Sequence, residues 1–271
     1  MALTPFLKMH GLGNDFVLID ARTTPVSLSP AQVRALADRR TGIGFDQLIL
    51  LEPSATATAR VRFWNSDGGE VAACGNGSRA VAAHLGGHSL LETGGGLLTA
   101  NASGAHAEVD MGPPRFGWQE VPLAWAMDTA HLPLAWDELT DPAALSVGNP
   151  HVVFEVPDSA SVPLETLGPR IETDAVFPEA VNVGVAQVLD PTHIALRVWE
   201  RGAGLTRACG TGAVAAVAAL QRRGRLSTAL PVRVTMPGGD LSVRRDSAGH
   251  LHLSGPALVA FRGQVDLEDY S

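Results

Sequence analysis

Short apolar runs separated by polar turns fill most of this 271-residue chain. Runs rich in Val, Ile, Leu and Phe have the length and composition of β-strands. The predicted strands are Phe16–Ile19, Leu48–Leu51, Val152–Val156, Ile194–Trp199 and Val232–Thr235. The pattern therefore predicts a chain made mostly of β-sheet.

Three segments predict helices instead. Ser29 and Pro30 are typical of a helix start, because Ser caps free N–H groups and Pro suits the first helical position; this helix should continue to about Arg40. The segments Ser78–Leu85 and Ala213–Leu220 consist largely of Ala and Val, which indicates helices that are buried on nearly all sides. A buried helix among strands predicts a layer of strands curled around a central helix.

The chain repeats itself. Cys74 and Cys209 lie 135 positions apart (209 − 74), and the same offset relates other polar and aromatic landmarks. The matched pairs are Arg62–Asn65 with Arg197–Glu200, Ala73–Gly77 with Ala208–Gly212, Gly13-Asn14 with Gly148-Asn149, and Gln47 with Asn182. The constant offset indicates two homologous halves, each carrying one of the two buried helices.

Two prolines at positions 113 and 114 disfavour continuation of regular structure and mark a break between the halves. We expect an α+β fold of two pseudo-symmetric halves, residues 1–113 and 114–260. The surplus C-terminal segment, residues 261–271, is expected to return to the first half.

Charge and cysteine content narrow the function. The formal net charge of −8 leaves no broad basic field for nucleic acid, and no apolar run approaches the roughly 20 residues that span a bilayer. The chain contains two cysteines and no CxxC pair, which argues against a disulfide framework and against a metal cluster. These features predict a cytoplasmic protein without a metal site that acts on a small molecule.

The repeated Cys-Gly-x-Gly motif is suited to proton transfer. A thiol at a helix start lies beside unpaired backbone N–H groups, which stabilise a thiolate and also bind carboxylates. One thiolate and one thiol on opposite faces of a substrate carbon would invert its configuration. No dinucleotide or nucleotide-phosphate motif is present, so the sequence calls for no cofactor. Either motif alone is more typical of a glycine turn with a packed thiol, whereas the duplicated pair favours catalysis.

Five motifs resemble those of the diaminopimelate epimerase family. They are Met9–Phe16, Gly42–Gln47, Cys74–Gly77, Val147–His151, and Val198–Gly204 with Ala208–Gly212. The resemblance implies two halves that are each a β-barrel around a central helix. It also implies conversion of LL-diaminopimelate to the meso form, a step that feeds lysine and cell-wall synthesis.

The same resemblance implies roles for individual residues. Cys74 would be the proton donor and Cys209 the acceptor with LL-substrate, and His151 and Glu200 would tune the thiols. The implied substrate contacts are Asn14, Gln47, Asn65, Gly75, Asn76, Asn149, Asn182, Glu200, Arg201, Gly210 and Thr211. A homodimer is also implied, with Phe261 where the family commonly has tyrosine. Leu205 is a further departure, since the family usually has Glu there.

Three other functions stay open at this stage. A proline or hydroxyproline racemase would share both cysteines, but it typically has His where this chain has Asn76. An isomerase of the phenazine-biosynthesis type would share the fold and lack the cysteine pair. A binding module that has lost its chemistry would react slowly with thiol reagents, whereas catalytic cysteines react readily.

Overall fold

The computed structural model describes residues 3–72 and 74–270, so Ala73 of the first cysteine motif lies outside the described residues. The chain forms two compact units, Met1–Val109 with Gly255–Ser271, and Asp110–Ser254. The sequence places the first division after residue 113 and begins the returning segment at residue 261. In the structure the first boundary lies four residues earlier, after Val109, and the returning segment begins six residues earlier, at Gly255.

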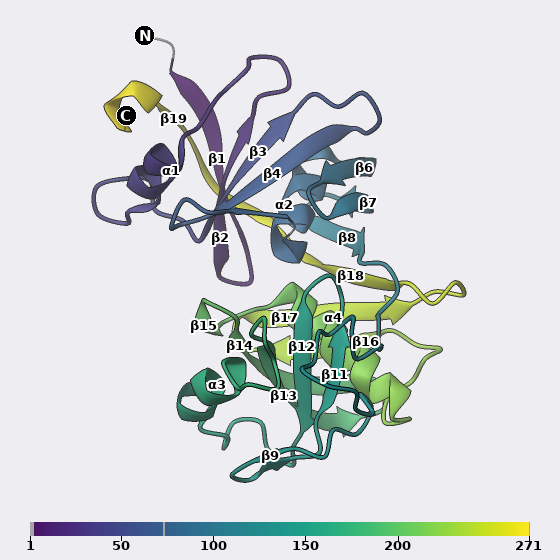
Figure 1. Cartoon of the computed structure of the whole chain (residues 1–271). Helices are drawn as coiled ribbons and strands as arrows, with labels where there is room; N and C mark the ends of the chain where they lie inside the picture. The colour runs from purple at the N-terminus through teal and green to yellow at the C-terminus, as the bar shows by residue number, and fades with distance from the viewer. Residues whose placement is uncertain (1–2, 73, 271) are drawn as a thin grey trace. The chain divides into compact units, whose positions relative to one another are not determined.

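The first unit is a curved sheet that surrounds helix α2 (Figure 1). Its strands are β1 (Thr4–Gly11), β2 (Asn14–Asp20), β3 (Gln47–Glu52), β4 (Ala59–Asn65), β5 (Glu70–Val71), β6 (Gly87–Thr93), β7 (Gly96–Ser103), β8 (His106–Asp110) and β19 (Leu258–Val265). From β1 to β2, β3, β4, β6, β7 and β8, successive pairings are antiparallel, parallel, antiparallel, parallel, antiparallel and antiparallel.

The second unit repeats this order around helix α4. Its strands are β9 (Ala135–Trp136), β10 (Leu139–Thr140), β11 (Ala143–Ser146), β12 (Pro150–Glu155), β13 (Asn182–Asp190), β14 (His193–Glu200), β15 (Gly204–Thr206), β16 (Val232–Met236), β17 (Gly239–Arg245) and β18 (Leu251–Pro256). From β11 to β12, β13, β14, β16, β17 and β18, the pairing senses follow the same sequence as in the first unit.

The strand registers carry the 135-residue offset into three dimensions. Phe16 pairs with Gln47 between the parallel strands β2 and β3, and His151 pairs with Asn182 between β12 and β13. Each residue of the second pair is 135 positions after its counterpart. The duplication inferred from sequence is therefore a duplication of fold, and the predicted α+β architecture is confirmed.

Two peripheral helices occupy equivalent places. Helix α1 (Pro30–Ala37) begins as predicted, with Ser29 accepting from the Gln32 N–H and the Gln32 side chain accepting from the Ser29 N–H. It ends before the predicted Arg40, because the Asp38 side chain accepts from two later backbone N–H groups and forms a turn. Its counterpart α3 (Leu164–Glu172) is absent from the sequence predictions; Pro163 and Pro169 obscure it.

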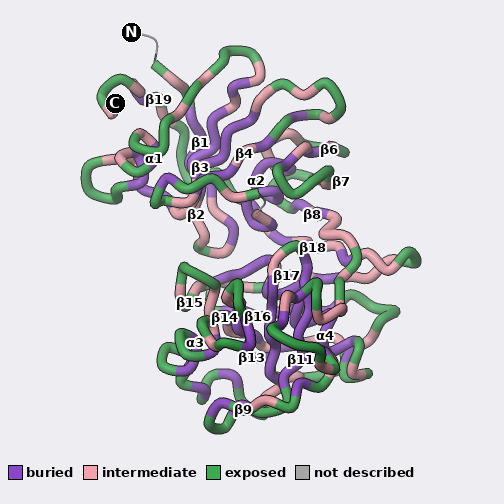
Figure 2. Tube along the Cα trace, in the orientation of Figure 1, coloured by how far each residue is buried: buried purple, intermediate pink, exposed green. Residues whose placement is uncertain are grey.

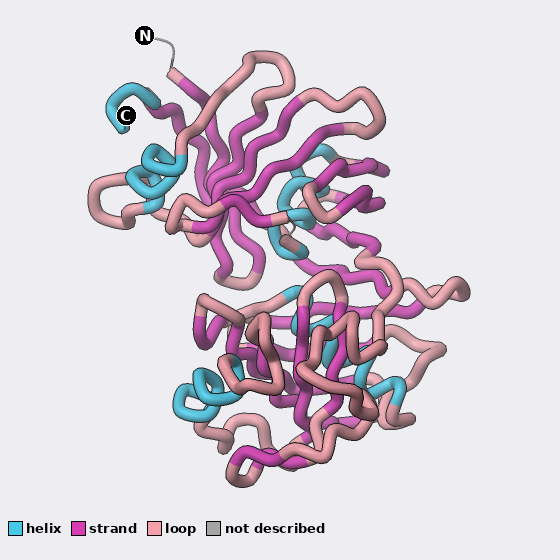
Figure 3. Tube along the Cα trace, in the orientation of Figure 1, coloured by secondary structure: helices cyan, strands magenta, loops and turns pink. Residues whose placement is uncertain are grey.

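The central helices are α2 (Gly75–Leu85) and α4 (Gly210–Arg222). Helix α2 lies against β1, β2, β6 and β7, whereas α4 lies against β11, β12, β13, β14 and β17. Residues Gly75–Ala82 and Ala213–Gln221 are buried (Figure 2). The prediction of two helices buried on nearly all sides is confirmed, and strands provide most of the remaining regular structure (Figure 3).

Each unit has its own apolar core. In the first, Val33 and Leu36 of α1 pack with Val17, Leu48 and Trp64 of the sheet. The C-terminal strand β19 joins this unit by antiparallel pairing with β1, and the short 3-10 helix η1 (Leu267–Tyr270) follows it.

In the second unit, the core residues Phe154, Leu167 and Val183 come from β12, α3 and β13. Among residues 3–72 and 74–270, no helix is long and apolar enough to cross a membrane.

Candidate active site

Each unit places a cysteine at the start of its central helix. Cys74 is the N-cap of α2 and its Sγ accepts from the Gly77 N–H at 3.2 Å; Cys209 is the N-cap of α4 and its Sγ accepts from the Gly212 N–H at 3.3 Å. A side chain that accepts this bond replaces one missing intrahelical acceptor. The predicted location of both cysteines at helix starts is confirmed.

The second glycine of each motif is required by close packing. A Cβ on Gly77 would lie 2.8 Å from Phe63 Cε1, and a Cβ on Gly212 would lie 2.8 Å from Val198 Cγ2. Phe63 and Val198 are themselves 135 positions apart, on β4 and β14. These two glycines therefore let a strand side chain approach the helix start at the same place in both units, a reason that the sequence did not indicate.

Four polar residues of the first unit form a continuous row beside Cys74. Arg79 Nη1 donates to Asn76 Oδ1 at 2.9 Å, Asn76 Nδ2 donates to Asn14 Oδ1 at 3.1 Å, and Asn14 Nδ2 donates to Asp46 Oδ2 at 2.9 Å. Asn76 is buried and Asn14 is half-buried. The structure thus brings together two predicted substrate contacts, Asn14 and Asn76, with two residues that sequence analysis did not select.

A second pair of amides lies at the ends of β3 and β4. Gln47 Nε2 donates to Asn65 Oδ1 at 2.9 Å across the antiparallel pair. Gln47 Oε1 is buried and has no hydrogen-bond partner among the described residues. A buried acceptor without a partner is costly, so this oxygen is suited to receive a donor from a ligand.

In the second unit, a row of neutral groups leads to Cys209. His151 Nε2 lies 3.0 Å from Asn149 Oδ1, Asn149 Nδ2 donates to Thr211 Oγ1 at 3.4 Å, and Thr211 Oγ1 lies 3.5 Å from Cys209 Sγ. Four predicted site residues are therefore in contact. Thr211 occupies the position that is Asn76 in the first unit.

The two titratable groups at the ends of this row, Cys209 and His151, have pKa values that are shifted toward their uncharged forms. Burial, with a smaller effect of the Glu200 charge, holds the pKa of Cys209 well above its usual range, and the hydrogen bonds from Thr211 and Gly212 oppose this shift. Burial, and then the Arg201 charge, lower the pKa of His151 to about 3. The Gly212 N–H at the helix start lowers the pKa of Cys209 as expected, but desolvation of the thiolate outweighs this effect.

The remaining predicted residues of the second unit lie around the β14–β15 turn. Asn182 Nδ2 donates to the Pro150 carbonyl at 2.8 Å, while its Oδ1 accepts from the Arg201 N–H at 3.0 Å. The Arg201 guanidinium is exposed and Nη1 donates to the Glu179 carbonyl at 2.8 Å. Glu200 accepts from Thr206 Oγ1 at 2.6 Å. Asn182 therefore supports the backbone of the loop that presents Arg201.

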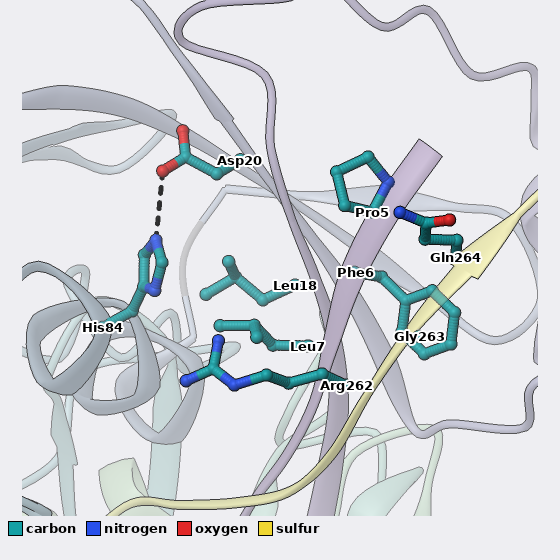
Figure 4. A pocket seen from close by; sticks show the side chains of 9 residues that line it. All are labelled: Pro5, Phe6, Leu7, Leu18, Asp20, His84, Arg262, Gly263 and Gln264. Carbon is teal, nitrogen blue, oxygen red and sulfur yellow. Dashed lines mark hydrogen bonds and ion pairs between the residues drawn. The ribbon is translucent and has the colours of Figure 1, made fainter. Parts of the chain in front are cut away.

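The cavity in Figure 4 belongs to the first unit and has a volume of about 490 Å³. Leu7, Leu18 and Arg262 line it, and the hydrogen-bonded side chains of His84 and Asp20, 3.0 Å apart, lie on one side. None of the predicted site residues lines this cavity. Among the described residues, no cluster of three or more His, Cys, Asp or Glu side chains is placed to hold a metal ion.

Sequence reasoning missed Asp46 and Arg79, and a signal was present for each. Asp46 stands directly before Gln47 in one of the motifs quoted above. Arg79 is an arginine in the middle of a helix that consists mostly of Gly, Ala and other small residues, where a charge is unusual.

Comparison with known proteins agrees with this arrangement. The family model "Diaminopimelate epimerase" matches residues 6–117 and 143–259. A diaminopimelate epimerase of Erythrobacter litoralis is 55% identical over 267 residues, covering 98% of each chain. One of Rhizorhabdus wittichii is 54% identical over 266 residues, covering 98% of this chain and 96% of the relative.

Solved structures share the fold at much lower identity. A phenazine biosynthesis protein of the PhzF family from Bacillus anthracis has a TM-score of 0.71 at 17% identity, covering 98% of this chain and all of that one. A probable proline racemase from Agrobacterium radiobacter has a TM-score of 0.69 at 16% identity, covering 97% and 93%. These two likenesses show the fold alone, whereas the sequence relatives show that the chain belongs to the diaminopimelate epimerase family.

Proposed function

We propose that this chain converts LL-2,6-diaminopimelate to the meso form by passing an α-proton between the thiols of Cys74 and Cys209, without a cofactor. The observation that carries the proposal is the repeated arrangement of a cysteine at the N-cap of a buried helix, with its sulfur accepting a helix N–H in both units. Membership of the diaminopimelate epimerase family supports the same reaction and its place in lysine biosynthesis.

In the proposed reaction, one thiolate removes the α-proton and the other thiol returns a proton to the opposite face. Negative charge builds on the substrate carboxylate as the proton leaves. The helix starts at Gly75-Asn76 and Gly210-Thr211 offer backbone N–H groups that have no intrahelical acceptor, which suits them to hold that carboxylate.

With LL-substrate, Cys209 is the proposed proton acceptor and Cys74 the donor, and the roles are exchanged in the reverse direction. Cys209 carries its proton in the substrate-free structure because burial and the Glu200 charge raise its pKa. The LL direction therefore requires the other protonation state of the pair: Cys209 releases its proton to solvent and Cys74 takes one up, so that the number of protons on the two thiols is unchanged. Glu200, whose carboxylate is hydrogen-bonded to the thiol, is the group proposed to pass the Cys209 proton to solvent.

The proposed contacts with the rest of the substrate are polar. They are Asn14, Gln47, Asn65, Asn149, Asn182, Glu200 and Arg201. The buried Gln47 Oε1 is suited to accept from a substrate ammonium group. The exposed Arg201 guanidinium can hold a carboxylate through two parallel hydrogen bonds, which a substrate with two carboxylates requires.

We also propose that the protein works as a homodimer in the cytoplasm. Strand β19 exposes Leu258, Val259 and Phe261, whose accessible fractions are 43%, 42% and 50%. Exposed apolar side chains grouped on one strand are typical of an interface. Two cysteines that must remain free for catalysis suit a reducing compartment. The variant Phe261→Asp should shift the sedimentation coefficient from that of a dimer to that of a monomer; an unchanged dimer would exclude this surface.

The activity is tested by incubating the reduced protein with LL-diaminopimelate in deuterated water without added cofactor. The expected result is meso product with one solvent deuterium at the inverted carbon, detected by chiral chromatography and mass spectrometry. A folded, reduced protein that gives neither product nor exchange would overturn the proposal. Exchange of L-proline under the same conditions would assign it to the racemases instead.

A further inference from the structure

Arg79 is a buried guanidinium inside the central helix of the first unit. Its exposed fraction is 0%, and its sequence neighbours on α2, Ser78 and Ala80, are small residues. Nη1 donates to Asn76 Oδ1 at 2.9 Å, while Nε and Nη2 have no hydrogen-bond partner among the described residues. Within residues 3–72 and 74–270, no carboxylate lies within ion-pair distance of this side chain. A charge in such a place needs a counter-charge from elsewhere.

The guanidinium nevertheless keeps its proton at neutral pH. Burial lowers the pKa of Arg79 to about 10, and the negative charge of the Cys74 thiolate acts in the opposite direction. Interaction between two titrating groups is reciprocal, so a positive charge that is stabilised by the thiolate stabilises the thiolate in turn. Cys74 is thus the described group that compensates the buried charge.

The Arg79 charge also determines how the amides of the polar row are oriented. Arg79 can only donate hydrogen bonds, and the Asp46 carboxylate at the other end can only accept them. The direction of every bond between them follows: Asn76 must accept from Arg79 and donate to Asn14, and Asn14 must donate to Asp46. The charged ends therefore determine the orientation of both amides.

The surrounding backbone leaves room for the guanidinium. A Cβ on Gly11 would lie 3.1 Å from Arg79 Nη2 and 3.4 Å from the Pro256 carbonyl oxygen. Glycine at this position keeps the β1–β2 turn clear of the buried charge, in the same motif that carries Asn14.

The second unit has no such row. The residues 135 positions after Asp46 and Arg79 are Val181 and Val214, both completely buried. The charge that acts on Cys209 is the negative Glu200 instead. The two units therefore share the cysteine, but the charge beside it is positive in the first unit and negative in the second.

We propose that Arg79 is a positioning residue that holds Cys74 in the thiolate form and orients Asn76 and Asn14 for substrate. This inference rests on the proposed function, in which Cys74 exchanges a proton with the substrate. It assigns the resting negative charge to Cys74 and the resting proton to Cys209, which is the protonation state that the reverse direction uses and that must be exchanged before LL-substrate reacts.

The other charged groups on the strands packed against α2 have hydrogen-bond or ion-pair partners of their own. On the strands packed against this helix, Lys8 pairs with Asp15, Asp20 pairs with His84, and Glu92 accepts from Ser54. The further titratable groups on these strands are His10 and His88. All remain unchanged in the variants below, so a difference between variants reports on Arg79.

The test is a titration of Cys74 in a Cys209→Ala background, followed by thiolate absorbance and by alkylation rate. Arg79→Met removes the charge and should raise the pKa of Cys74 by about 1 to 3. Alkylation at a fixed pH below that pKa should slow at least about tenfold. The matched control is Val214→Met, which changes the equivalent helix position in the other unit and should leave the titration of Cys74 unchanged.

Two further variants separate charge from packing and keep the test decisive if Arg79→Met does not fold. Arg79→Lys keeps the charge and should titrate near the parent protein, whereas Arg79→Gln keeps a donor for Asn76 and should titrate like the methionine variant. Equal titrations of the Lys and Gln variants, in proteins with parental circular dichroism, would overturn the proposal.

This readout needs no turnover. If the Arg79 variants leave the pKa of Cys74 unchanged and the parent protein epimerises diaminopimelate, only the role of Arg79 is rejected and the proposed function stands. A shifted titration in a protein that never epimerises diaminopimelate would reject the proposed function and leave the charge assignment standing.

Discussion

The two halves share a fold, a strand register and a cysteine at the start of a buried helix, yet the surroundings of the two thiols carry opposite charge. Cys74 lies in a unit where the buried cation Arg79 ends a row of amides. Cys209 is 2% exposed and interacts with the anion Glu200. In the proposed mechanism, the duplication supplies two equivalent acid/base groups, and the opposite charges beside them make their proton affinities differ. A two-base epimerase needs this difference, because one thiol must carry a proton while the other does not.

Removal of either thiol should have the largest effect. Cys74→Ala and Cys209→Ala should each lower the kcat for epimerisation by about 10²- to 10⁴-fold, the usual contribution of a general acid or base. The measurement is a chiral assay of meso product from LL-substrate. If either variant kept near-parental turnover, that cysteine would not take part in the reaction, and the comparison of the two thiols as acid/base groups would be wrong.

The packing shared by the halves predicts the next effect. Gly77→Ala and Gly212→Ala each place a methyl group 2.8 Å from a strand side chain and should destabilise the protein by about 1–3 kcal/mol in urea unfolding. Gly184→Ala is the control, since its Cβ would meet its neighbour at an ordinary 3.6 Å.

A double variant tests whether the close contact causes the loss of stability in Gly212→Ala. Val198→Ala removes the group that a Cβ on Gly212 would meet, so it should recover part of the stability lost in Gly212→Ala. Strictly additive losses would show that the close contact is not responsible.

The charge beside Cys209 predicts a pH effect. In a Cys74→Ala background, Glu200→Gln should lower the pKa of Cys209, because a negative charge that favours the protonated thiol is removed. At a fixed pH below that pKa, the thiolate absorbance should increase. Asp240→Asn removes an exposed carboxylate of the same unit and should change nothing. A higher pKa in Glu200→Gln would contradict the opposite-charge comparison.

The peripheral helices predict the smallest effect. Helix α1 has a side-chain cap from Ser29, whereas its counterpart α3 has Pro163 at the cap position and no such bond. Ser29→Ala should lower the free energy of unfolding by about 1 kcal/mol in urea titration. Ser29→Thr keeps the accepting oxygen and should lose less; equal losses would show that the cap contributes little.

The sequence by itself determined the elements and the duplication. The strands around Phe16 and His151, the start of α1 at Ser29, and the helices after Cys74 and Cys209 all follow from local composition and from one constant offset. These features depend on residues close together in the chain, or on a copy of the same segment. The diaminopimelate epimerase motifs added the candidate site residues.

Only the tertiary structure revealed the charges that surround the two thiols. Burial of Cys209, its contact with Glu200, and the row from Asp46 to Arg79 bring together residues that are as many as 62 positions apart, and their effect depends on desolvation. The close approach of Phe63 to Gly77 likewise arises from a strand packed on a helix. No local pattern encodes the distance between such groups, so the chemistry that distinguishes the halves becomes visible only after the chain has folded.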